Sequence, residues 1–183
     1  MSADLKARIV ERVKDDLEKV EQALHDNLTP SLDLVSEIAG HLLFSGGKRL
    51  RPLLMIHSAR MCSYSSGFEI RFSTIFEYLH AATLLHDDVV DGAALRRGRT
   101  AAHKVWDSPI VVLTGDFLLA RASEVAAPLG TEAVALIART YATLCEGQVL
   151  ELQLDNDLDH GPDEYYRVIG GKTASLIRTS ARL

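Results

Sequence analysis

Three aspartates fall within five positions of the sequence, in the segment LLHDDVVD at 84–91. On a helix, Asp87 and Asp88 would each lie close to one turn before Asp91, so the three carboxylates would share one side. Like charges at this spacing repel, and a bound cation would remove that cost. Mg²⁺ takes one or two carboxylates together with waters and phosphate oxygens. The pattern therefore predicts a magnesium site, and a solvated acidic helix end is the alternative that so short a pattern leaves open.

Basic residues gather in three other short segments. They are GGKRLRP at 46–52, LRRGRT at 95–100 and GGKTAS at 170–175. Arginine offers a forked, permanently charged donor suited to phosphate, and lysine offers a point charge. A helix stop followed by a solvated turn is the alternative for GGKRLRP. GGKT is not a Walker motif, because it lacks the preceding glycine of a P-loop and no strand comes before it. Metal and bases together indicate a ligand that carries phosphate.

The residues before the aspartates offer two further candidates. His80 lies seven residues before Asp87, two helical turns along the same face, where a histidine is more often a packed core residue than a ligand. Leu79 shares that face, and Ala82 and Thr83 lie about one turn before the carboxylates. Small residues at these positions allow either close helix packing or space for an apolar substrate tail.

Helices must position these residues, because apolar residues recur at intervals of three and four along nearly the whole chain. The sequence predicts helices over 5–28, 30–45, 51–65, 69–91, 108–127 and 131–157 and a last one from 162, with a loop over 92–107. No segment alternates as a strand does, so we expect an all-α helical bundle. The apolar pattern continues to Leu183. We therefore expect 1–183 to be one domain that is incomplete at its C-terminal end.

Composition narrows the class of protein. The 183 residues include 20 Lys and Arg against 25 Asp and Glu, and this mildly negative balance suggests neither a nucleic-acid partner nor polybasic membrane binding. No apolar run approaches the roughly 20 residues of a spanning helix. The charged N-terminal segment resembles no targeting peptide. Cys62 and Cys145 have no CxxC partner, so buried free thiols in a reducing compartment are expected, with a disulfide left open.

Taken in their order along the chain, the motifs together resemble those of one protein family. GGKRLRP, HAATLLHDDVVD, LRRGRTAAHKVW, LTGDFLLARA, CEGQVLELQ and GGKTASL resemble, in order and spacing from about Phe44 onward, the head-to-tail trans-polyprenyl diphosphate synthases. Among these the likeness is to the long-chain members, such as octaprenyl and solanesyl diphosphate synthases. The resemblance implies a bundle of the isoprenoid synthase type, of which this chain is the N-terminal part.

The resemblance also implies roles for individual residues. The first aspartate-rich motif would bind Mg²⁺ that bridges an allylic diphosphate such as farnesyl diphosphate, through Asp87, Asp88 and Asp91. Arg96 would hold that diphosphate, and Lys172 and Thr173 would reach its leaving group. The diphosphate of isopentenyl diphosphate would be held by Lys48, Arg51, His80 and Arg97. Gln148 and Glu151 match polar positions that line the site.

The implied activity is a prenyl transfer that makes a long all-trans polyprenyl diphosphate. Short-product members usually carry a bulky aromatic where this chain has Ala82 and Thr83, so the small residues imply a long product, with Leu79, Leu118 and Leu119 further along the tunnel. The resemblance implies a cytoplasmic homodimer, loosely attached to membranes through its product at most.

One part of the family pattern is missing. The second aspartate-rich motif follows GGKT in the family, whereas LDNDLDH at 154–160 precedes it here. We therefore expect the N-terminal part of a longer enzyme. The alternatives are a non-catalytic diphosphate-binding subunit, an inactive fragment, or a terpene cyclase, although GGKRLRP argues against a cyclase because a cyclase binds no second diphosphate substrate.

Overall fold

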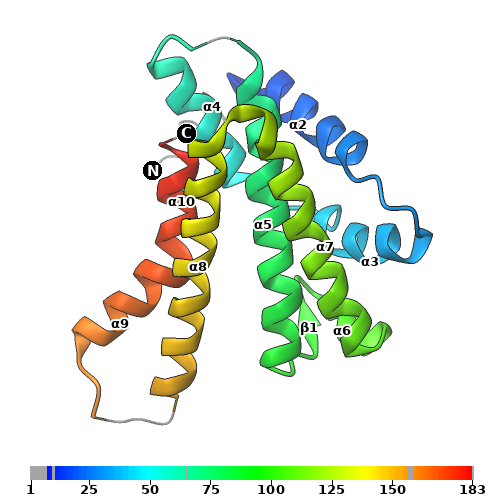
Figure 1. The fold of residues 1–183 in the computed structure, drawn as a ribbon, viewed down its shortest axis with the longest axis vertical. Coiled ribbons are helices and arrows are strands. Elements are labelled where there is room, and N and C mark those ends of the chain that lie inside the picture. The colour runs from blue at the N-terminus through cyan, green and yellow to red at the C-terminus, as the bar shows by residue number, and fades with distance from the viewer. Residues whose placement is uncertain (1–7, 10, 65, 156–158, 183) are drawn as a thin grey trace.

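The computed structural model describes residues 8–9, 11–64, 66–155 and 159–182, and it confirms the all-α fold (Figure 1). The first half contains α2 (Lys14–Asn27), α3 (Asp33–Leu43), α4 (Leu50–Met61), α5 (Phe68–Val90), β1 (Leu95–Arg96) and β2 (Arg99–Thr100). The second half contains α6 (Ala102–Val105), α7 (Ser108–Ala126), the 3₁₀ turn η1 (Ala127–Leu129), α8 (Thr131–Leu154), α9 (Pro162–Ile169), the π-helical η2 (Gly170–Ala174) and α10 (Ser175–Ser180).

Helix α5 forms the centre of the bundle. Figure 1 shows it alongside α7, with α2 and α3 on one side and the α8–α10 arm on the other. Ile75, Phe76 and Tyr78 are fully buried on α5, and burial of each such side chain contributes about 1.5–3 kcal/mol. The Tyr78 hydroxyl donates to the Leu24 carbonyl at 2.8 Å, which ties α5 to α2. The rigid middle of α5 thus leads directly into the aspartates at its end.

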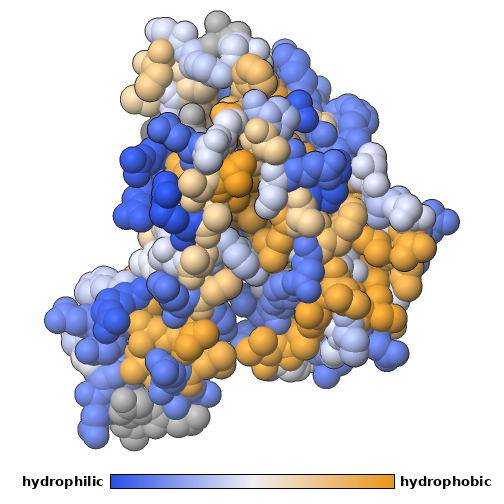
Figure 2. Space-filling view, viewed as in Figure 1, coloured by the Kyte–Doolittle hydropathy of each residue, from blue (hydrophilic) through white to orange (hydrophobic). Residues whose placement is uncertain are grey.

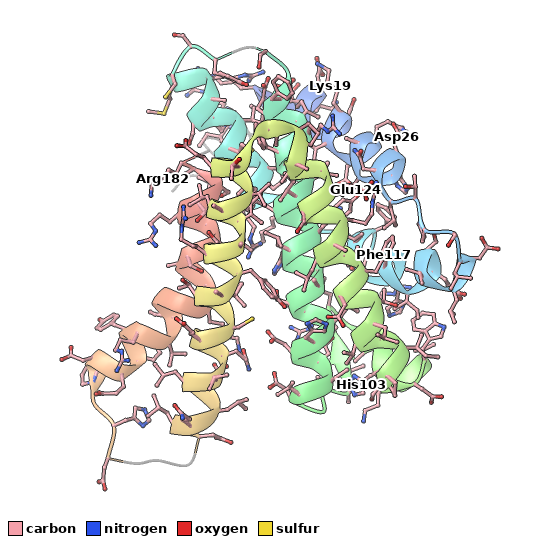
Figure 3. The ribbon with its side chains drawn as sticks, in the orientation of Figure 1. Lys19, Asp26, His103, Phe117, Glu124 and Arg182 are labelled. Atoms are coloured by element: carbon pink, nitrogen blue, oxygen red, sulfur yellow. The ribbon has the colours of Figure 1, made fainter. Side chains whose placement is uncertain are left out.

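Helix α7 is held against its neighbours by both apolar and polar contacts. Phe117, labelled on α7 in Figure 3, packs against the core, and Arg121 donates through Nε to the Asn27 carbonyl at 3.0 Å. Arg121 also pairs with Glu124, which Figure 3 labels further along the same helix. These contacts place α7 between α5 and the end of α2.

The predicted loop over 92–107 contains more structure than expected. Strands β1 and β2 form a short antiparallel hairpin with Leu95 opposite Thr100 and Arg96 opposite Arg99. Arg97 and Gly98 join them with φ values of 52° and 77°. Positive φ at both central residues is typical of a type I′ turn, whose twist suits a hairpin. The hairpin fixes where Arg96 and Arg97 lie relative to α5.

Three other expectations need correction. Helix α3 begins at Asp33 rather than near 30, and the single helix expected from 162 is interrupted by the π-helical η2. Cys62 and Cys145 are free, as expected, but both are exposed, because Cys62 follows the end of α4 and Cys145 lies on an open side of α8. Within the described part of the chain, no helix combines the length and low charge of a membrane span.

Large apolar side chains remain exposed on the lower parts of α7 and α8. They include Leu113, whose exposed fraction is 66 %, together with Ile110, Val149 and Leu152. Figure 2 shows hydrophobic areas over the lower ends of these helices. Large exposed apolar patches mark contacts with other protein or with a membrane, or grooves that bind a ligand.

Candidate functional site

Basic residues from three separate segments meet in one pocket, hereafter the basic pocket. It measures about 340 Å³ and is lined by Gly47, Lys48, Arg49, Leu50, Arg51, Glu77, His80 and Arg97. The turn before α4 and the first turn of α4 form one side, the middle of α5 forms another, and the β1–β2 turn closes it. The four residues expected to hold one diphosphate, namely Lys48, Arg51, His80 and Arg97, therefore lie together.

The basic pocket holds positive charge that the protein does not fully neutralise. The buried Nε of Arg51 has no hydrogen-bond partner among the described residues. Burial lowers the pKa of Arg51, Glu77 opposes this shift and Arg97 adds to it. Burial also lowers the pKa of His80 to about 3, with further lowering by the surrounding arginines, so its imidazole is neutral near pH 7. Such a pocket attracts a polyanion.

The β1–β2 turn is connected directly to the glycine turn before α4. Arg97 donates to the Gly46 carbonyl and to the Ser45 hydroxyl, the latter at 3.3 Å. Gly46 has a φ of 86°, a left-handed conformation that glycine adopts at little cost. The contact brings the Arg97 guanidinium over the mouth of the basic pocket.

The sequence did not lead us to Arg49, a buried residue whose contacts support the lining of the basic pocket. Its side chain is buried and donates to the carboxylates of Glu77 and Glu21 and, at 2.7 Å, to the Leu43 carbonyl. Its backbone adopts a left-handed φ of 45° immediately before α4. Glu77 is a single acid between Phe76 and Tyr78 in an apolar helix, and buried glutamates are almost always paired. The position of Glu77 in the sequence could therefore have indicated that a buried cationic residue pairs with it.

The aspartates at the end of α5 do not share one environment. Asp88 is buried, with an exposed fraction of 1 %, and accepts from Arg96 through Nε at 2.8 Å and through Nη2. The hydrogen bond that Arg96 donates to Asp88 raises the pKa of Arg96. Asp87 is half-buried and Asp91 is exposed just beyond the helix. Burial raises the pKa of Asp87, Lys172 opposes this shift and Asp91 adds to it.

The free carboxylates fit a divalent cation. Among the described residues, no group of three or more His, Cys, Asp or Glu side chains is placed to hold a metal unaided. Asp87 and Asp91 make no side-chain hydrogen bond or ion pair there, and their mutual repulsion is the cost that a cation removes. Mg²⁺ needs only one or two carboxylates when phosphate oxygens and water complete its shell. The arrangement suits a cation that arrives with a phosphorylated ligand.

Charged residues of α8 and η2 lie close enough to Asp87 to influence the pKa of its carboxylate. Lys172 pairs with Glu151, and both charges act on Asp87 across the intervening space. Both amide atoms of Gln148 are buried without a hydrogen-bond partner in the described structure, while Thr173 is exposed. The unpartnered amide suits a polar ligand group.

The three residues expected to govern product length lie in the core. Leu79, Ala82 and Thr83 are buried, and Thr83 donates to the His80 carbonyl at 2.9 Å. Leu118 of α7 is buried in the same core cluster as Leu79 and Ala82. Close packing of α5 and α7 accounts for this burial, so a role in product length stays a prediction.

Comparisons with known proteins identify the family of this chain. A family model described as Polyprenyl synthetase matches residues 32–183. Octaprenyl diphosphate synthase of Escherichia coli (strain K12) is 33% identical over 176 residues, covering 96% of this chain and 54% of that protein. Nonaprenyl diphosphate synthase of Mycobacterium tuberculosis is 37% identical over 172 residues, covering 93% of this chain and 51% of that protein.

A solved structure gives the same result for the fold. The crystal structure of polyprenyl synthase from Caulobacter crescentus CB15, complexed with calcium and isoprenyl diphosphate, matches with a TM-score of 0.92 at 37% identity. The match covers 96% of this chain and 54% of that chain. This chain spans about half the length of the relatives that it matches. By its sequence and its fold, the chain belongs to the polyprenyl synthetase family.

Proposed function

We propose that this chain is the N-terminal part of a larger all-α trans-polyprenyl diphosphate synthase. The enzyme would condense isopentenyl diphosphate head-to-tail with an allylic diphosphate. The observation that carries this proposal is the basic pocket, where Lys48, Arg51, His80 and Arg97 converge. The buried Arg51 Nε has no hydrogen-bond partner in the described part of the chain. A second polar region at the end of α5 supplies a separate place for the second diphosphate.

In the basic pocket, the side chains would bind and orient isopentenyl diphosphate. Lys48 and Arg97 stand at the exposed mouth, and Arg51 lies deeper. Neutral His80 can donate one N–H to a diphosphate oxygen without adding charge. Binding holds one substrate in the orientation in which it reacts. The binding energy thus offsets much of the translational and rotational entropy that the two substrates lose on meeting.

At the end of α5, Asp87 and Asp91 would hold Mg²⁺, and Asp88 could join them if Arg96 transferred its donors to the diphosphate. Bound Mg²⁺ would supply positive charge that stabilises the departing diphosphate. Arg96 and Lys172 would donate to the same oxygens, and Thr173 and Gln148 would contact the allylic end.

The reaction breaks the allylic C–O bond and releases diphosphate. The double bond of isopentenyl diphosphate then attacks the allylic carbon, and a new C–C bond forms. The resulting cation loses a proton to the released diphosphate. This loss gives an allylic diphosphate that is one isoprene unit longer. The sequence of steps requires no side-chain nucleophile.

We also propose a long product and assembly as a cytoplasmic homodimer. Ala82 and Thr83 provide no bulky floor below the aspartates, and the exposed apolar residues of α7, including Leu113, provide surface that a second copy could cover. Replacement of Thr83 by phenylalanine should shorten the product. An unchanged product length would exclude this face of α5 as the tunnel wall.

The direct test uses the longest chain that the gene encodes. Isotopic isopentenyl diphosphate, farnesyl diphosphate and Mg²⁺ should give labelled products of increasing length, and chelation of the metal should stop the incorporation. Absence of extension under these conditions would contradict the proposal. Extension that appears only after a second protein is added would instead favour the non-catalytic subunit.

A further inference from the structure

The backbones of α8 and η2 touch at two glycines. A side-chain carbon built on Gly147 would lie 2.6 Å from the backbone nitrogen of Lys172 and 3.0 Å from the carbonyl carbon of Gly171. A carbon built on Gly171 would lie 3.1 Å from both the Gly147 Cα and the Thr143 carbonyl oxygen. Backbone atoms cannot rotate aside as a flexible side chain can. Any residue larger than glycine at 147 must therefore push η2 away from α8.

The contact occurs where the helical hydrogen-bond pattern changes. Residues 170–174 form a π-helical segment between α9 and α10, and such segments are frequent at functional sites. The hydroxyl of buried Ser175 donates to the Gly171 carbonyl at 2.5 Å. The widened turn thus has its own polar support, and Lys172 lies within it.

The same contact determines where the Lys172 side chain lies. Glu151 follows Gly147 by four residues on α8, so the two lie on one face of that helix. Lys172 follows Gly171 directly and its ammonium pairs with Glu151. From there its charge acts on the Asp87 carboxylate. The position of η2 against α8 therefore decides whether the Lys172 ammonium faces the end of α5.

We propose that Gly147 and Gly171 are positioning residues, whose backbone contact holds Lys172 against the allylic diphosphate at Asp87. This inference rests on the proposed function, because it concerns the same reaction. The glycines touch no substrate and act through the lysine. A purely structural contact would affect folding without any specific dependence on Lys172.

The first experiment compares two alanine variants in the longest chain that the gene encodes. Gly147→Ala should lower kcat/KM for the allylic substrate about 100-fold, the loss expected for a displacement of about 1 Å. The KM for isopentenyl diphosphate should change little, because the basic pocket lies on other elements. Gly170→Ala is the matched control, since its added carbon meets no described atom within 4 Å and its φ is −62°. It should stay within about twofold of the parent protein.

The second experiment tests whether Gly147 acts through Lys172. With Lys172→Met in place, Gly147→Ala should cause little further loss, because the group that it positions is already absent. Losses that multiply in the double variant would overturn the inference, as would normal kinetics in Gly147→Ala. If Gly147→Ala fails to fold, the milder Gly171→Ala takes its place in the same cycle.

A measurement on the 183-residue chain separates this inference from the proposed function. In the presence of Mg²⁺, inorganic diphosphate should bind about tenfold more weakly to Gly147→Ala than to Gly170→Ala, the effect of one weakened charged hydrogen bond. Equal affinities would contradict the positioning role. A parent protein that never extends a prenyl chain would contradict the proposed function alone.

Discussion

The basic pocket and the end of α5 both suit a diphosphate, but their charges are balanced in opposite ways. In the basic pocket, Arg49 is paired with Glu77 and Glu21, while the buried Nε of Arg51 has no hydrogen-bond partner among the residues that the structure describes. At the end of α5, the cations are already paired, Arg96 with Asp88 and Lys172 with Glu151. The first region is organised in advance for an anion. The second must exchange internal ion pairs for ligand contacts.

The largest effect should come from the buried support of the basic pocket. Arg49→Met leaves the buried Glu77 carboxylate without its partner, so the free energy of unfolding should fall by about 3–5 kcal/mol in urea titrations. Arg60→Met is the matched control, because Arg60 also pairs with an acid of α2, Asp16, but at the surface. It should cost less than about 1 kcal/mol. Equal losses of unfolding free energy in the two variants would show that Arg49 does not support the basic pocket in this way.

The next effect separates function from stability at the end of α5. Asp87→Asn should lower Mg²⁺-dependent extension by about 10²–10³-fold, because it removes a charge that would hold the metal. The variant should unfold at the same or a higher temperature without ligand, since burial and Asp91 raise the pKa of Asp87 and make its charged form unfavourable. Asp88→Ala should instead lower the unfolding temperature, because Arg96 loses its partner. If Asp87→Asn extended prenyl chains normally, the metal assignment would be wrong.

A smaller effect concerns the pH dependence of the basic pocket. The pKa of His80 is about 3 in the folded chain and near 6.5 when unfolded, so the unfolded chain binds more protons between these values. Stability should therefore fall as the pH drops through this range. His80→Gln should make the slope shallower by at most about 1.4 kcal/mol per pH unit in urea titrations. Inorganic diphosphate should also make this slope of stability against pH shallower in the parent chain, because the negative charge of the bound anion offsets the positive charge of the arginines around His80. Identical slopes with and without His80 would contradict this account.

The smallest effect tests whether the ion pairs at the end of α5 compete with ligand. Glu151→Gln should change the free energy of unfolding by less than about 1 kcal/mol, because the pair with Lys172 is partly exposed. Calorimetry should show that inorganic diphosphate with Mg²⁺ binds at least as tightly as to the parent chain, since Lys172 is released for it. Weaker binding would mean that Glu151 supports the ligand rather than competing with it.

Much of the fold could be predicted because its signals are local. Apolar spacing predicted the extents of α5, α7 and α8 to within a few residues, since a helix that buries one face requires that spacing. The hairpin at 95–100 was missed, because its strands contain only two residues each and carry no alternation. The π-helical η2 was missed because apolar spacing does not distinguish a π-helical turn from an α-helical one, and the residue that η2 closely approaches, Gly147, is distant in sequence.

The candidate site was predicted unevenly for a similar reason. Motif resemblance named Lys48, Arg51, His80 and Arg97, and the structure places them in one pocket. It said nothing of Arg49, which lies between two of them and turns the other way. The aspartate spacing placed three carboxylates on one side of a helix, whereas Asp88 is turned to Arg96. Spacing places residues on a helix face, but the partners across from that face come from other elements.

The helical class of this protein, the family that it resembles and the residue types available for metal and diphosphate can all be read from the amino-acid sequence. These properties follow from local spacing and side-chain chemistry. Which basic side chains stay free and which are neutralised depends on the folded molecule, because burial and pairing involve groups brought together from distant segments. The charge that each region can offer a ligand is therefore a property of the packed molecule.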